Sequence, residues 1–196
     1  MRIKGFCIAL SVLFACAAAA VAQESGAITS YLKGLRAGAE KGDADAQYHL
    51  GAMYMVGRGV PQDYTQAVKW FRLAASKQSE VAQRSLGFAY KFGQGVSQDY
   101  TEAARWFRLA ADQGEALAQE ELGAFYANGQ GVPKDYVRAH MWLNLSAAQG
   151  NQLATKYRTT VSNYMTPEQI AEAQRLAGEW KPGSQLSQEH QAGPQR

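Results

Sequence analysis

The residues from Gly57 to Tyr64, GRGVPQDY, are of types that could bind a phosphate group. Two glycines one residue apart would expose backbone amides, and an aspartate precedes a segment with helical spacing. The phosphate-binding sequence G-x-G-x-x-G is not completed, however, because Gln62 fills its last position, and no strand-like segment precedes the glycines. The alternative is a turn between two helices, in which Gly57 ends the first helix in the left-handed conformation and Asp63 caps the second.

Recurrence decides between these two alternatives. The same loop occurs three times at a spacing of 36 residues, with the glycine pairs Gly57/Gly59, Gly93/Gly95 and Gly129/Gly131. Asp63-Tyr64, Asp99-Tyr100 and Asp135-Tyr136 follow them, and Trp70, Trp106 and Trp142 follow in turn. A phosphate loop is normally a single feature, whereas a loop with a fixed period belongs to a repeat architecture. We therefore interpret the loop as a turn between helices.

The remaining candidates for chemistry are few. None of His49, His140 and His190 has a second histidine at metal-ligand spacing, so we expect packed or solvated imidazoles and no metal or cofactor. No G-x-S-x-G sequence is present, and the pair Glu120-Glu121 is interpreted as a solvated helix surface. We predict that the protein is not an enzyme and has no catalytic residues. A cell-envelope enzyme, such as a cell-wall or β-lactam hydrolase, is the alternative.

Residues 1–22 have the pattern of a signal peptide. Arg2 and Lys4 precede an uncharged apolar run, and Ala20-Val21-Ala22 supplies the small residues of a cleavage site. We expect cleavage after Ala22 and a periplasmic or secreted protein. A retained anchor helix is one alternative. Lipidation at Cys16 is a minor one, because the sequence LFAC is a poor lipoprotein box.

Cleavage would leave a nearly neutral chain. Both cysteines, Cys7 and Cys16, lie in the segment that is removed, so thiol chemistry is excluded from the mature protein. Loss of Arg2 and Lys4 lowers the formal charge from +3 to +1. Without a basic cluster we expect no nucleic-acid partner, and no membrane association unless Cys16 is lipidated.

Each 36-residue unit is predicted to contain two helices. In the first unit the spacing predicts helix A over about 44–56 and helix B over about 64–77. Leu50, Gly51 and Tyr54 fall on one side of helix A, where the glycine would let a neighbouring helix approach closely. A unit this small cannot bury such a face alone, so it must stack on its neighbours.

The repeated pattern G-D-A-x-A-Q-x-x-L-G-x-x-Y-x-x-G-x-G-V-x-x-D-Y, continued by A-x-x-W-x-x-x-A-A, resembles the Sel1-like repeat, a relative of the tetratricopeptide repeat. The resemblance covers about 39–148, and the second unit departs from it at Gln78 and Ser79, where Gly-Asp is usual. It implies an all-α fold, a right-handed α-solenoid of stacked helix-turn-helix repeats with terminal capping helices, and a protein-interaction role.

Cysteine-rich Sel1-like relatives have been credited with β-lactamase activity, and SYLK at Ser30 to Lys33 fits the S-x-x-K pattern of penicillin-recognising enzymes. The S-D-N and K-T-G sequences of those enzymes are absent, as are the disulfides of those relatives. This activity is therefore not transferred to the chain.

The repeats set the expected organisation of the chain. After the signal peptide, 23–38 is expected to hold an N-terminal capping helix, and 39–74, 75–110 and 111–146 to be repeats one, two and three. A degenerate repeat and a C-terminal capping helix are expected in 147–180, and a disordered tail in 181–196. Thr166 and Gln169 predict a capping box at the start of the capping helix.

A partner-binding surface is predicted from the positions that the repeat does not fix. These positions lie on the side of helix A opposite Leu50, or beside that opposite side. In tetratricopeptide-like arrays the side opposite the packed one lines the concave groove. They hold Asp45, Tyr48, Met55, Arg84, Phe88, Lys91, Phe92, Glu120 and Asn128. Outward aromatic residues beside Arg84 and Lys91 would suit an extended peptide or a helix with acidic residues. We expect a monomer that binds a protein or peptide.

Overall fold

The computed structural model describes residues 26–183 of the 196-residue chain. The predicted signal peptide and the predicted tail beyond residue 183 lie outside the described residues. Within 26–183 every regular element is an α-helix. No helix in this part of the chain is both long and apolar enough to cross a membrane.

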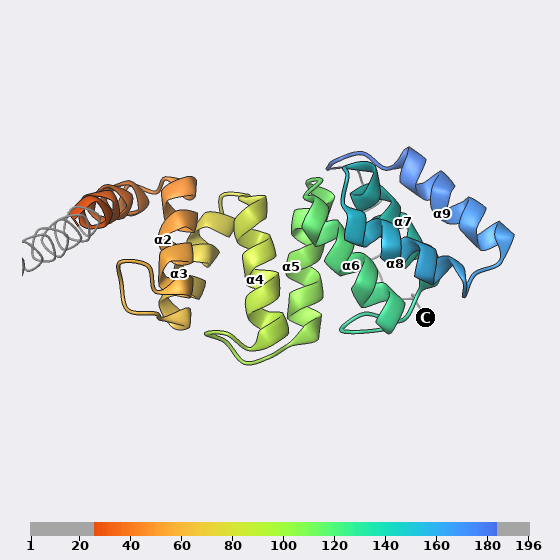
Figure 1. Cartoon of the computed structure of the whole chain (residues 1–196), viewed down its shortest axis with the longest axis horizontal. Helices are drawn as coiled ribbons and strands as arrows, with labels where there is room; N and C mark the ends of the chain where they lie inside the picture. The colour runs from red at the N-terminus through yellow and green to blue at the C-terminus, as the bar shows by residue number, and fades with distance from the viewer. Residues whose placement is uncertain (1–25, 184–196) are drawn as a thin grey trace, which may run out of the picture.

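Two kinds of helix, A and B, alternate along an elongated array (Figure 1). An N-terminal helix, described over 26–40, precedes the A helices, which are α2 (Ala44–Val56), α4 (Glu80–Phe92), α6 (Ala116–Asn128) and α8 (Gln152–Ser162). The B helices of the three units are α3 (Tyr64–Ala75), α5 (Tyr100–Asp112) and α7 (Tyr136–Ala148), and α9 (Pro167–Glu179) closes the chain. Helix A of the first unit has the predicted bounds, and α3 ends two residues before the predicted end.

The Gly-x-Gly loops are turns between helices, as predicted. Gly57 ends α2 in the left-handed conformation, with φ 72°, and its amide donates to the Met53 carbonyl. The carboxylate of Asp63 accepts a hydrogen bond from the Gln66 amide and so caps α3. Gly95, the second glycine of the next turn, also lies against the preceding unit, because a Cβ there would be 2.2 Å from the Tyr64 carbonyl oxygen.

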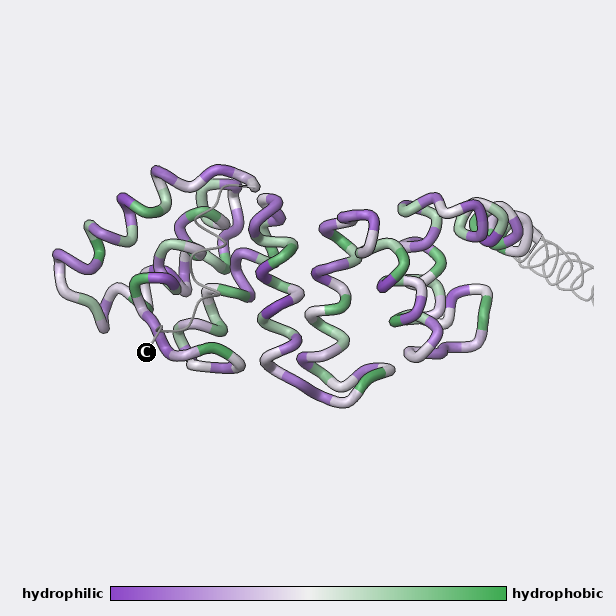
Figure 2. Tube along the Cα trace, turned by 180° about the vertical axis from the view of Figure 1, so that it is seen from behind, coloured by the Kyte–Doolittle hydropathy of each residue, from purple (hydrophilic) through white to green (hydrophobic). Residues whose placement is uncertain are grey.

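In each of the three units the A helix packs closely on its own B helix through a helical glycine. A Cβ at Gly51 would lie 2.7 Å from the ring of Phe71, and Gly87 meets Phe107 in the same way. The rings of Phe107 and Phe125 meet edge to face at 5.4 Å and join the second unit to the third. In Figure 2 hydrophobic and hydrophilic residues alternate along the helices, as expected when one flank of each helix is buried.

Polar contacts between units repeat with the sequence. Arg72 on α3 donates to the Tyr90 hydroxyl on α4 at 2.8 Å, and Arg108 on α5 donates to the Tyr126 hydroxyl on α6. After the third unit, Asn144 on α7 stands at the position of the two arginines and accepts a hydrogen bond from Arg158 on α8 at 2.5 Å, but Arg158 is not at the position of the tyrosines. The array is therefore held by side-chain hydrogen bonds as well as by apolar packing.

The chain does not complete a fourth unit of the same kind. Helix α9 starts at the predicted capping box of Thr166 and Gln169 and packs mainly against α7, so α8 has no closely packed B helix of its own. Trp180, just after α9, meets the ring of Trp142 edge to face at 6.1 Å.

The residues of α7 explain why α9 packs there. Val137, Met141 and Leu145 form an apolar stripe that is half-buried in the structure. The corresponding positions hold Thr65, Lys69 and Leu73 on α3, and Thr101, Arg105 and Leu109 on α5, and all six are exposed. Only the stripe of α7 is apolar throughout, so it offers more apolar surface to a covering helix than the other two.

Candidate partner-binding surface

One side of the A helices carries exposed and half-buried residues at a spacing of four, three and four. This spacing places four residues each of α2, α4 and α6, and three residues of α8, on one side. We call this surface the A-helix face; it consists of Asp45, His49, Ala52 and Val56 on α2, Val81, Ser85, Phe88 and Phe92 on α4, Leu117, Glu121, Ala124 and Asn128 on α6, and Leu153, Tyr157 and Thr160 on α8. Large apolar side chains are exposed here, including Val56 at 66%, Phe92 at 58% and Leu153 at 45%.

Four of the predicted site residues lie on this face. Asp45, Phe92 and Asn128 are exposed there. Phe88 is half-buried, because its ring stacks on that of Phe92 at 6.1 Å and meets the core ring of Phe107 edge to face at 5.1 Å. Phe92 is therefore the exposed aromatic side chain of α4, and the ring of Phe88 packs between it and the core.

Three predicted residues that share one repeat position face neighbouring helices instead. The Tyr48 ring lies 5.8 Å from that of Phe71, and Arg84 Nε is 3.2 Å from a carboxylate oxygen of Glu115. Glu120 is 7% exposed and accepts a 2.7 Å hydrogen bond from Asn151. The side chains of these three residues pack against neighbouring helices, contrary to the prediction, although Glu120 also lines the pocket between α6 and α8 described below.

The outward stripe is thus rotated by one residue from the predicted one. The position one residue further on, which holds His49, Ser85, Glu121 and Tyr157, lies on the A-helix face in its place. The following unit covers the predicted position, as the Arg84–Glu115 and Glu120–Asn151 contacts show. Tyr157, a large aromatic residue at the repeat position of His49, was the residue in the sequence that could have indicated the correct rotation.

Met55 and Lys91 also share a position and are drawn into internal contacts. Met55 is half-buried against the apolar core of α3 and α4. Lys91 Nζ is 2.6 Å from Glu121 and lies 5.3 Å from the ring centre of Phe92. Arg84 and Lys91 are each paired with a carboxylate, so neither offers an unpaired charge on this surface.

A pocket of about 430 Å³ lies towards the C-terminal end of the A-helix face, between α6 and α8. Phe125, Leu153 and Tyr157 give it apolar walls, while Lys91 and Glu121 form an ion pair at its edge. An apolar hollow with a few polar groups is typical of sites that bind a side chain or a small ligand.

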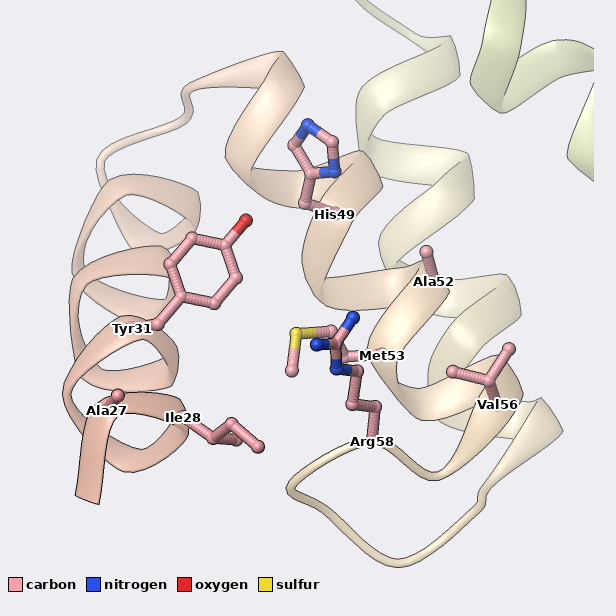
Figure 3. Close-up of a pocket in the computed structure, with 8 residues that line it drawn as sticks. All are labelled: Ala27, Ile28, Tyr31, His49, Ala52, Met53, Val56 and Arg58. Atoms are coloured by element: carbon pink, nitrogen blue, oxygen red, sulfur yellow. The ribbon is translucent and has the colours of Figure 1, made fainter. Parts of the chain in front are cut away.

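A larger pocket of about 600 Å³ lies at the other end, between the N-terminal helix and α2 (Figure 3). Ile28 and Tyr31 point into it from the N-terminal helix, and Met53 faces them from α2. Its polar groups are the Tyr31 hydroxyl, His49 and Arg58. The sequence did not reveal this pocket, because it depends on how the N-terminal helix packs on the first repeat.

The titratable groups with shifted pKa values lie outside both pockets. Burial, helped by Arg158, lowers the pKa of His140, and burial raises the pKa of Asp112 to about 6 against the opposing charge of Arg108. Burial also raises the pKa of Glu115. Among the described residues, no group of three histidine, cysteine, aspartate or glutamate side chains could hold a metal ion. These three shifted groups therefore reflect burial within the array and do not line either pocket.

Comparisons with known proteins show which family has this architecture. The family model described as Sel1 repeat matches residues 44–79, 81–115 and 116–151. Among solved structures, the chain is similar to a Sel1 repeat protein from Oxalobacter formigenes, with 40% identity and a TM-score of 0.62, over 66% of this chain and 97% of that one. No match is found among the curated proteins.

The chain is also similar to a protective antigen present in uropathogenic Escherichia coli strains that displays an SLR fold. The identity is 30% and the TM-score 0.59, over 84% of this chain and 44% of the antigen, so the match spans less than half of that protein. Sel1 repeats are commonly scaffolds for protein interaction. With three consecutive matched repeats on an all-helical array, the chain belongs to the Sel1 repeat family.

Proposed function

We propose that this protein is an exported, non-enzymatic adaptor that binds a protein or peptide partner on its A-helix face. The observation that carries the proposal is the exposure of large apolar side chains on this face, with Phe92, Leu153 and Tyr157 as its main members. Exposed apolar residues that gather on one face mark interaction sites. A pocket towards each end of the face would accept further side chains of the partner.

Export is proposed from the signal-peptide pattern of residues 1–22. The protein would act as a monomer in the periplasm or after secretion. Sel1 repeats are typically non-catalytic scaffolds, which agrees with an adaptor role. Binding through a preformed rigid face would cost little conformational entropy, which favours affinity from a modest contact area.

The proposal is tested by capture of partners from the cell envelope of the producing bacterium. The protein, purified as its cell processes it, is compared with a Phe92→Ala/Tyr157→Ala variant and a control variant, Leu73→Ala/Leu109→Ala. Leu73 and Leu109 are also exposed apolar residues, but they lie on the B helices. All four substitutions remove exposed side chains, so both variants should keep the helix content of the unaltered protein.

We expect the unaltered protein and the control variant to capture the same partner, and the A-helix variant to lose it. Truncation of a central aromatic residue typically reduces affinity by about 2 kcal/mol or more. Capture by the A-helix variant at the level of the unaltered protein would contradict the proposal. Loss in the control variant alone would move the binding surface to the B helices.

A further inference from the structure

The pocket between the N-terminal helix and α2 combines apolar walls with one unpaired cation. Ile28, Met53 and Val56 give the apolar walls, and Arg58 extends from the turn after α2 toward Met53 (Figure 3). Arg58 is exposed and forms no ion pair within the described part of the chain. None of the described residues that line this pocket is acidic.

Of the three turns, only that of the first repeat has a charged residue at the position of Arg58. The other two turns hold Gln94 and Gln130 at the position of Arg58. The position of His49 on α2 holds Ser85 on α4 and Glu121 on α6. Arg58 is therefore not required by the turn, because the other two turns form with an uncharged glutamine at this position.

Unpaired charge distinguishes Arg58 from the two cations on α4. Arg84 is 3.2 Å from Glu115, and Lys91 is 2.6 Å from Glu121, so each is already neutralised within the array. A partner carboxylate placed at either of them would have to compete with a resident carboxylate. At Arg58 a carboxylate could form a charge-assisted hydrogen bond without displacing one.

We infer that this pocket binds an acidic–apolar segment of the partner. A bulky apolar side chain would insert between Ile28 and Met53, and a carboxylate within one or two residues of it would bind Arg58. This inference rests on the proposed function and deepens it, because it assigns one end of the A-helix face to a partner segment of defined charge. The volume of about 600 Å³ is ample for an aromatic or aliphatic side chain with its flanking backbone.

The chain itself supplies the matched variant. Arg58→Gln installs the residue that the other two turns carry, and the contact of the Arg58 amide with the Met53 carbonyl, at 3.1 Å, involves only backbone atoms. The variant should therefore keep the turn and the fold while it removes the cation. A thermal unfolding curve that overlays that of the unaltered protein would establish this before binding is measured.

The test is an NMR titration of the ¹⁵N-labelled protein with three acetylated and amidated hexapeptides. Each has a central phenylalanine flanked by two aspartates, two asparagines or two lysines. We expect the aspartate peptide to shift the amide signals of Ile28, Met53 and Arg58. The asparagine peptide should bind about fivefold more weakly than the aspartate peptide. The aspartate peptide should bind Arg58→Gln about fivefold more weakly than it binds the unaltered protein, because a fivefold change is the size of one partly exposed charge pair.

Equal affinity for the aspartate and lysine peptides, or an unchanged affinity in Arg58→Gln, would overturn the inference. Shifts confined to α6 and α8 would also overturn it, but they would leave the A-helix face as a binding surface. The absence of any shift would reject the acidic–apolar segment alone, because the proposed function is judged separately by partner capture. Expected shifts together with failed capture would reject the adaptor and keep the pocket.

Discussion

The side-chain amide of Gln113 donates a 2.7 Å hydrogen bond to the side-chain oxygen of Gln83, and Gln149 makes the same bond to Gln119 at 2.9 Å. Each bond joins the end of a B helix to a buried glutamine of the A helix in its own unit. In the first unit Gln47 is the equivalent acceptor, and its Oε1 atom is buried without a partner. Lys77 stands where the other units have the donor glutamine.

Replacing Lys77 with glutamine should therefore stabilise the protein. The new amide would satisfy the buried Oε1 atom of Gln47, and one such bond is worth about 1 kcal/mol in the free energy of unfolding. Lys77→Met is the control, because it removes the same charge but cannot donate. Chemical denaturation of both variants checks the prediction, and an equal gain in the two would show that charge, not hydrogen bonding, is responsible.

The turn between the first and second repeats should also accept a stabilising change. Gln78 has a φ of 65°, a conformation that the equivalent Gly42, Gly114 and Gly150 adopt without a side-chain penalty. Gln78→Gly should raise the free energy of unfolding by about 1 kcal/mol, because an L-residue is strained in this region. Thermal unfolding measures the gain, and a lower melting temperature would contradict this account.

The sequence departs from the repeat again at the next residue. Ser79 makes no side-chain capping bond at the start of α4, whereas Asp43 and Asn151 cap α2 and α8. The turn therefore keeps its backbone conformation without the capping bond that the usual aspartate would supply.

Asp112 predicts a specific pH dependence of stability. Burial raises the pKa of this carboxyl from 3.8 to about 6, so the folded state binds the proton more tightly than the unfolded state does. Its contribution to the free energy of unfolding is therefore most favourable below pH 3.8. It declines as the pH rises and reaches its least favourable value above pH 6.

Asp112→Asn should remove this decline. The variant should be more stable than the unaltered protein at pH 7.5 by about 1 kcal/mol, a value that allows for partial solvent screening, and should differ little below pH 4. Urea unfolding at the two pH values measures the difference. A gain of the same size at both would show that ionisation of Asp112 is not its cause.

The second glycine of the turn should be far less replaceable than a glycine in open space. Gly95 has a φ of 75°, and a Cβ there would lie 2.2 Å from the Tyr64 carbonyl oxygen in the preceding unit. Gly95→Ala should cost roughly 3 kcal/mol through backbone strain and this clash. Gly150→Ala, with a φ of 90° but no atom within 4 Å, should cost only about 1 kcal/mol. Equal losses in denaturant titrations would exclude a tight inter-unit contact.

Sequence alone could predict the features that depend on residues a few positions apart. The bounds of α2, the left-handed Gly57 and the capping by Asp63 were all predicted, because helix ends are satisfied locally. The capping box of Thr166 and Gln169 was predicted for the same reason. The 36-residue period then implied that the units stack.

Features that depend on the neighbouring unit could not be predicted in this way. Lys91 and Glu121 are 30 residues apart, and their pairing follows from how α4 and α6 lie side by side. The rotation of the exposed stripe, which buries Glu120 and exposes Tyr157, has the same origin. To predict the position of α9, the three B helices would have to be compared with one another, since the apolar Met141 of α7 replaces the charged Lys69 and Arg105.

The most direct test of the A-helix face is photocrosslinking at Phe92 in the producing bacterium. A photoreactive phenylalanine analogue is placed at Phe92 in one strain and at Leu73 in another, two exposed apolar positions on an A helix and a B helix. The account predicts a discrete crosslinked product with a second protein from position 92 and none from position 73. A product from position 73 alone, or no product from position 92, would contradict it.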